Sequence, residues 1–161
     1  MLRAFDTAIV LQEVPNEITL AVSITGCSHR CEGCHSKYLW NGETGIPVLP
    51  HLNIWMEPYK KYITCVCFLG GDQDQEELVK LCEIVHQAGL KTCLYTGYDS
   101  MSDLITPLLN ELDYVKIGRY IQEKGPLNDP KTNQRFYQKG QDVSWIDVTD
   151  RFWTKYAEEK D

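Results

Sequence analysis

Three cysteines near the start of the sequence, Cys27, Cys31 and Cys34, have the spacing of a metal-binding loop. The pattern C-x3-C-x2-C brings three thiolates together within a short stretch of chain, as compact metal centres require. Gly26 and Gly33 allow the tight backbone conformations of such a loop. The sequence has seven cysteines, an odd number, and it begins without the apolar stretch of a secretion signal. Disulfide scaffolds are typical of exported proteins, so the pattern favours a metal site.

Three kinds of metal site are compatible with this spacing. A closed electron-transfer cluster takes four thiolates, yet the next cysteine is Cys65, which lies far along the chain. A structural zinc ion could recruit His29 or His35 as a fourth ligand, which gives a non-catalytic Cys3His zinc-binding module. A [4Fe–4S] cluster held by only three thiolates leaves one iron open to a small molecule, as catalytic metal sites do. We favour the third interpretation, and the zinc module is its main alternative.

The cysteine loop needs a rigid element before it, and the sequence predicts a strand there over residues 18–25. Another strand is predicted over residues 8–12. Downstream, apolar runs typical of buried strands alternate with segments of helical spacing. The further predicted strands span residues 64–69, 91–95, 113–117 and 143–148. A helix is predicted over residues 74–88, whereas residues 118–140 show no clear periodicity and are expected to form a loop.

The order of these elements predicts the fold class. Strands that are connected by helices pair in parallel, with right-handed crossovers. A closed eight-stranded barrel takes about 250 residues, and this sequence has 161. The expected fold is therefore α/β, with one domain over residues 1–161 and a mostly parallel sheet in an open, partial (βα) barrel.

Polar or glycine-containing turns follow three of the predicted strands. A Gly-Gly-Asp turn over residues 70–72 follows the strand 64–69, Thr96 and Gly97 follow the next strand, and Gly118 follows the one after. The carboxyl ends of parallel strands lie at one edge of a sheet, where α/β proteins bind their ligands. We expect these turns to meet the cysteine loop at that edge.

The cysteine pattern, placed after a barrel strand, resembles the signature of the radical S-adenosylmethionine (radical SAM) enzymes. In that family, the open iron of a [4Fe–4S] cluster binds the amino and carboxylate groups of S-adenosyl-L-methionine. One electron cleaves the sulfonium to methionine and a 5′-deoxyadenosyl radical, so cluster and cofactor carry the chemistry rather than a catalytic side chain. The resemblance implies Cys27, Cys31 and Cys34 as cluster ligands. The residues that it places nearest the cofactor are Gly33, Cys34, His35, Gly70, Gly71, Asp72, Thr96 and Gly97.

Within this family, the sequence most resembles the proteins that activate anaerobic (class III) ribonucleoside-triphosphate reductases. The motifs concerned are Thr25-Gly-Cys27, Cys31-x-Gly-Cys34, Trp40-Asn41, Leu69-Gly-Gly-Asp72, Tyr95-Thr-Gly-Tyr98 and Asn133-Gln-Arg135. The implied partners are the large reductase subunit, whose glycine loses a hydrogen atom to the radical, and a flavodoxin- or ferredoxin-like electron donor. A glycyl-radical enzyme of the pyruvate formate-lyase type is the alternative target. The sequence departs from the group at His35 and Gln73, where Tyr and Pro are usual.

The composition limits the other possible partners. The sequence has 16 basic and 23 acidic side chains, a formal net charge of −7, which argues against binding to nucleic acids or anionic membranes. No stretch of the sequence approaches the roughly 20 apolar residues that cross a bilayer, and a cytoplasmic location is expected. Cys65, Cys67 and Cys93 lie on predicted buried strands. We expect these three to pack in the core, with a second metal site or a redox pair as the alternative.

Overall fold

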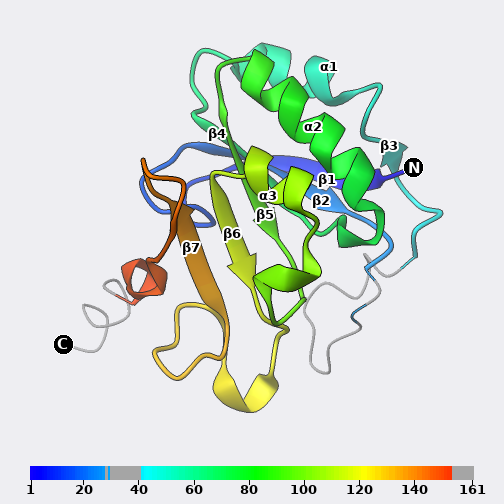
Figure 1. Cartoon of the computed structure of the whole chain (residues 1–161). Helices are drawn as coiled ribbons and strands as arrows, with labels where there is room; N and C mark the ends of the chain where they lie inside the picture. Colours follow the sequence, from blue (N-terminus) through cyan, green and yellow to red (C-terminus); the bar gives the residue numbers. More distant parts are fainter. Residues whose placement is uncertain (28, 30–40, 154–161) are drawn as a thin grey trace.

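The computed structural model describes residues 1–27, 29 and 41–153. In this part of the chain, eight strands form one sheet in the order β3-β1-β2-β4-β5-β6-β7-β8 (Figure 1). The strands are β1 (Arg3–Val10), β2 (Thr19–Ile24), β3 (Ile46–Pro47), β4 (Cys65–Leu69), β5 (Lys91–Tyr95), β6 (Tyr114–Ile117), β7 (Arg135–Lys139) and β8 (Trp145–Asp147). The α/β class is therefore as predicted.

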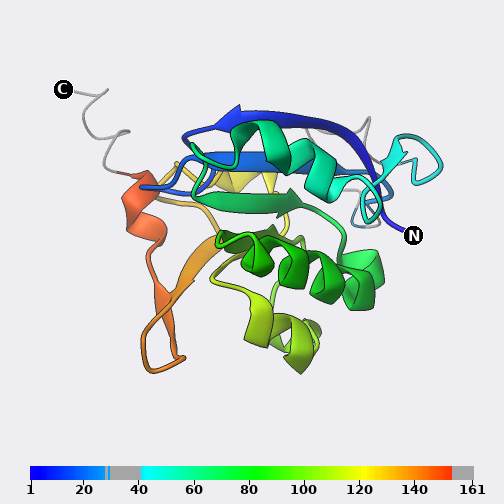
Figure 2. The ribbon, with the colours of Figure 1, turned by 90° about the horizontal axis from the view of Figure 1, so that it is seen from above.

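Three α-helices cover one face of the sheet in the described ranges, namely α1 (Leu52–Met56), α2 (Gln75–Gln87) and α3 (Thr106–Glu111). Figure 2 shows α2 and α3 side by side, with η6 (Thr149–Phe152) at the other end of the molecule. Short 3-10 turns complete the structure: η2 (Glu57–Tyr59), η3 (Asp72–Asp74), η4 (Met101–Asp103) and η5 (Gln122–Lys124). None of the helices in these ranges has the length and apolar character needed to cross a membrane.

The prediction of a mostly parallel sheet is wrong. The central strands β2, β4, β5 and β6 pair in parallel, but four of the seven pairings in the described sheet are antiparallel. The antiparallel pairings lie on both sides of the parallel strands. Strands β1 and β2, and likewise β7 and β8, are joined by short connections, which allow only an antiparallel pair. The longer connection from β6 to β7, all of which lies within the described residues, contains the 3-10 turn η5 but no α-helix that could form a parallel crossover. The sheet is mixed, and the partial-barrel curvature stays a prediction.

Strands β7 and β1 also differ from the sequence prediction. Strand β7 lies inside the segment 118–140, which was expected to be a loop. Only Phe136 in this strand is fully buried, while its neighbours Arg135 and Tyr137 are half-buried, so the alternation of apolar and polar residues is weak. Strand β1 begins at Arg3, five residues before the predicted start, because its exposed side chains follow no clear pattern. The predicted helix over 74–88 is confirmed as α2, which Asp74 caps by accepting a hydrogen bond from Glu77 N at 3.2 Å.

The core has two parts, one on each face of the sheet. The larger part packs the helices against residues such as Val66, Phe68 and Leu94. The smaller part, on the face opposite the helices, contains Cys65, Cys67, Cys93, Tyr114 and Phe136. The three cysteines are fully buried, and burial raises the pKa of the Cys65 and Cys93 thiols. Full burial in this cluster confirms that Cys65, Cys67 and Cys93 pack in the core.

Gly45 allows the chain to return from the cysteine loop to β1. Its φ is +98°, and a Cβ at this position would lie 2.3 Å from the carbonyl oxygen of Ala4. We expect Gly45→Ala to lower the free energy of unfolding by about 3 kcal/mol, because it adds a backbone collision to an unfavourable φ. Gly89→Ala is the control. Gly89 also has a positive φ of +77°, but no described atom lies within 4 Å of its Cβ position, so we expect a loss of about 1 kcal/mol. Equal losses in urea unfolding of the two variants would contradict this account.

Candidate functional site

The cysteine loop begins and ends at the same point of the structure. Thr25, which follows β2, donates a hydrogen bond from Oγ1 to the carbonyl oxygen of Thr44 at 2.9 Å. The backbones of Gly26 and Gly42 are also in contact, since a Cβ on Gly26 would lie 3.1 Å from Gly42 Cα. Cys27 comes directly after this junction and is partly exposed. Cys27 therefore lies just beyond the carboxyl end of β2, as the sequence predicts.

Several predicted site residues lie outside the described part of the chain. They are the cluster ligands Cys31 and Cys34 and the cofactor residues Gly33 and His35. Their assignment stays a prediction. The described residues of the predicted site are Cys27, Gly70, Gly71, Asp72, Thr96 and Gly97.

The Gly-Gly-Asp turn lies at the carboxyl end of β4. Gly70 and Gly71 have φ values of +100° and +103°, which a side chain makes unfavourable. Gly70 N donates to the carbonyl oxygen of Tyr95 at 3.0 Å, so this turn is attached to the end of β5. The turn points the following carboxylate, Asp72, into the protein, where only 5% of the residue is exposed.

Asp72 receives hydrogen bonds from two different elements. Thr96 Oγ1, at the end of β5, donates to Asp72 Oδ2 at 2.5 Å. His29, in the cysteine loop, places Nε2 2.7 Å from the same oxygen, and the ring nitrogen donates because a carboxylate only accepts. A buried carboxylate is costly unless such donors surround it. Asp72 thus connects the cysteine loop, β4 and β5.

Gly97 provides the surface on which the ring of His29 packs. A Cβ at Gly97 would lie 2.6 Å from His29 Cγ, closer than two carbon atoms can approach. Tyr98 also contacts this ring edge-to-face, with ring centroids 4.8 Å apart. The Thr96–Tyr98 turn therefore holds His29 as well as Asp72.

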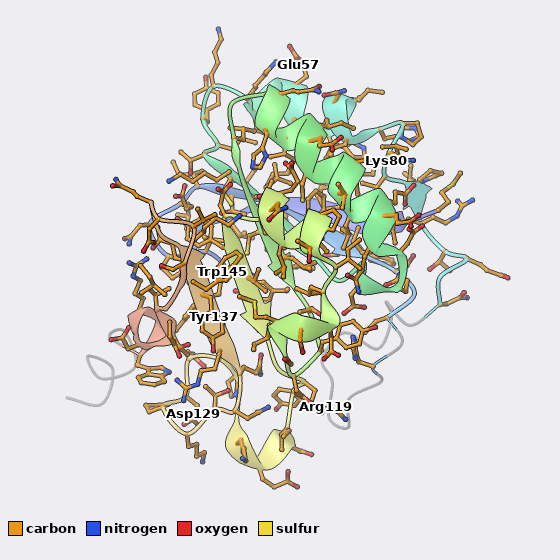
Figure 3. All side chains as sticks on the ribbon, in the orientation of Figure 1. Glu57, Lys80, Arg119, Asp129, Tyr137 and Trp145 are labelled. Atoms are coloured by element: carbon orange, nitrogen blue, oxygen red, sulfur yellow. The ribbon has the colours of Figure 1, made fainter. Side chains whose placement is uncertain are left out.

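The turn after β6 joins the same edge of the sheet. Gly118 N donates to the carbonyl oxygen of Tyr98 at 2.6 Å, and Thr96 N donates to that of Lys116 at 2.9 Å. Arg119, labelled in Figure 3, forms an ion pair with Asp99 at 3.2 Å. The prediction that the strand ends meet at one edge is confirmed.

Two contacts of the site were not expected from the sequence. Gln73 donates from Nε2 to the carbonyl oxygen of Thr25 at 2.8 Å, and so attaches the Gly-Gly-Asp turn to the base of the cysteine loop. The only signal for this residue was that glutamine replaces the usual proline. His29 was considered only as a zinc ligand, and its bond to Asp72 had no signal because the two residues lie 43 positions apart.

The described residues fit a site for an iron–sulfur cluster. Cys27 supplies a soft sulfur ligand at the end of β2. The buried Asp72 supplies negative charge at the neighbouring strand end. Gly70 and Gly71 give the turn before Asp72 its positive φ values, and Gly97 leaves room for the ring of His29. This combination suits a metal cluster that shares its site with a small molecule.

Comparison with known protein families agrees with this arrangement. The family described as "4Fe-4S single cluster domain" matches residues 18–138, which extend from the start of β2 to within β7. The chain belongs to this family. Membership supports an iron–sulfur cluster, and it disfavours the zinc module that the cysteine spacing left open.

A named relative extends the comparison. The chain is similar to the anaerobic ribonucleoside-triphosphate reductase-activating protein of Enterobacteria phage T4. The two are 29% identical over 111 residues, which are 60% of this chain and 67% of the relative. This similarity agrees with the resemblance drawn from the motifs of the sequence.

Proposed function

We propose that this chain is the activating enzyme of an anaerobic ribonucleoside-triphosphate reductase and that it uses S-adenosylmethionine as its cofactor. The main support for the proposal is that His29 of the cysteine loop and Thr96 both donate hydrogen bonds to Asp72 at one edge of the sheet. Membership of the 4Fe–4S family supports the cluster. Similarity to the phage T4 activating protein supports the activity and the target.

The cysteines of the loop would hold the cluster, and the strand ends would hold the cofactor. When bound, the cluster supplies the electron that cleaves S-adenosylmethionine and yields the 5′-deoxyadenosyl radical. Cys27, Cys31 and Cys34 would bind three irons. Gly70 and Gly71 would bring the backbone of their turn to the amino group of the cofactor, and Asp72 would supply a carboxylate beside it. Gly33, His35, Thr96 and Gly97 would complete the surroundings.

The fold proposed to carry this chemistry is the partial barrel of the radical SAM enzymes, with residues 1–161 as one domain. The substrate would be a glycine of the large reductase subunit, from which the radical abstracts a hydrogen atom. A flavodoxin- or ferredoxin-like protein would deliver the electron. We place the reaction in the cytoplasm, where these partners would be found.

The test is to reconstitute the protein anaerobically with iron and sulfide, reduce it, and add S-adenosylmethionine and the large reductase subunit. We expect 5′-deoxyadenosine and methionine as products, and a glycyl radical on the reductase by electron paramagnetic resonance (EPR). Deoxyadenosine without a glycyl radical would mean that the target is another enzyme, and pyruvate formate-lyase is the first to try. A colourless protein that contains zinc and no iron would overturn the proposal.

A further inference from the structure

His29 belongs to the cysteine loop, but its ring lies against the turns that follow β4 and β5. It lies two residues after Cys27, yet its ring points away from solvent and its side chain is only 13% exposed. It contacts Asp72, Gly97 and Tyr98, which belong to the turns after β4 and β5. A loop histidine without a role at the site would be expected to be more exposed to solvent than His29 is, since histidine is readily solvated.

The carboxylate of Asp72 is held from one side only. Both His29 Nε2 and Thr96 Oγ1 donate to Oδ2, and no described residue forms a hydrogen bond to Oδ1. With two donors on one oxygen, the carboxylate is fixed in orientation and its second oxygen keeps lone pairs for another donor. An ammonium group is the ligand that a buried carboxylate favours most.

We propose that His29 is a positioning residue that fixes Asp72 for the amino group of S-adenosylmethionine and so couples the cysteine loop to cofactor binding. This inference rests on the proposed function. His29 lies between two of the proposed cluster ligands in sequence, so a loop held by the cluster would also hold the imidazole. The imidazole in turn orients the carboxylate, as outer hydrogen-bond partners orient metal ligands in other proteins.

Gly97 helps to position the ring of His29. Its φ is not in the left-handed region, and the three described atoms nearest to a Cβ at this position all belong to the ring of His29, the first of them at 2.6 Å. Alanine at this position would push the ring off Asp72 without removing any hydrogen-bonding group. The effect of Gly97→Ala should therefore depend on the presence of His29.

The experiment measures the dissociation constant of S-adenosylmethionine on the anaerobic, cluster-loaded protein in its oxidised form. We expect His29→Ala to weaken binding about 10-fold or more, since a hydrogen bond to a charged group is lost. Iron content and cluster absorption should stay at the wild-type level. His29→Gln, whose amide nitrogen can replace Nε2, should restore binding to within about threefold. Gly97→Ala should weaken binding like His29→Ala, and it should have no further effect in the double variant.

Three results would overturn the inference. The first is equal binding by wild type and His29→Ala. The second is loss of iron from His29→Ala, which would make His29 a residue of cluster assembly. The third is an imidazole nitrogen coupling in the EPR spectrum of the reduced cluster that disappears in His29→Gln, which would make it a ligand. A wild type that contains the cluster but binds no S-adenosylmethionine would overturn the proposed function itself.

Discussion

Replacing Cys27 with alanine should leave the protein without its cluster. Three thiolates are the minimum that holds a [4Fe–4S] cluster in the proposed site, and two do not retain it when one iron is already open. We expect iron to fall from about four atoms per chain, the content of one such cluster, to near zero. The brown absorption and the formation of 5′-deoxyadenosine should be lost with it. Iron and sulfide analysis of anaerobically purified protein measures the effect.

Cys82→Ala is the matched control for this variant. Cys82 is buried in α2, in the core on the helix side of the sheet, and burial raises the pKa of its thiol so that it stays protonated. Its replacement should cost about 1 kcal/mol of stability, as many core substitutions do, and leave the iron content unchanged. Full iron in Cys27→Ala, or the same loss in both variants, would show that Cys27 is not a ligand.

Replacing Glu17 with alanine should cause a large loss of stability. Its side chain is only 6% exposed. The carboxylate accepts hydrogen bonds from Lys91 Nζ at 2.8 Å, Tyr114 Oη at 2.9 Å and Thr64 Oγ1 at 2.5 Å. These donors come from β5, β6 and the residue before β4, so one carboxylate joins the amino ends of three parallel strands.

We expect Glu17→Ala to lower the free energy of unfolding by about 3 kcal/mol, because the Tyr114 hydroxyl is left buried without its acceptor. Urea denaturation followed by circular dichroism, under anaerobic conditions at neutral pH, measures the change. Glu123 is exposed and forms no ion pair with a described residue, so Glu123→Ala is the control and should stay within about 0.5 kcal/mol of wild type. Equal stability of wild type and Glu17→Ala would contradict the role of the carboxylate.

The effect of Glu17 should depend on pH in a definite direction. Burial by itself would raise the pKa of Glu17, but the hydrogen bonds from Lys91, Thr64 and Tyr114 outweigh it and hold the pKa below its usual value. A carboxyl group with a lowered folded-state pKa contributes its full stabilisation above the unfolded pKa of about 4.3. The contribution is lost as the pH falls through the folded pKa. The gap between wild type and Glu17→Ala should therefore shrink in acid, and a gap that grows would be inconsistent with this pKa.

The sequence was informative where chemistry limits the choice of residue. The cysteine spacing indicated the iron–sulfur family, and the glycines after β4 and β5 indicated the edge of the sheet at which ligands bind. The buried strands β4, β5 and β6 were recognised from their apolar runs. These features are local, so each is visible in a few consecutive residues.

The sequence was uninformative where structure depends on distant pairing. The mostly parallel sheet was inferred from strands connected by helices, but β7 and β8 attach without a helix and run antiparallel. The bond between His29 and Asp72 joins residues 43 positions apart. Gln73 looked like a simple departure from the usual proline, and only the fold shows that its amide reaches Thr25. Side-chain hydrogen bonds of this kind leave no periodic trace in a sequence.

The junction at the base of the cysteine loop affects the order of folding and cluster assembly. Bringing the two ends of a loop together has an entropic cost. Here, the hydrogen bond from Thr25 to Thr44 and the contact of Gly26 with Gly42 bring the two ends together through protein contacts alone. The binding of iron and sulfide therefore need not supply the free energy for bringing the ends of the loop together. Cluster assembly can follow folding, and protein stripped of iron should accept a new cluster without first being unfolded.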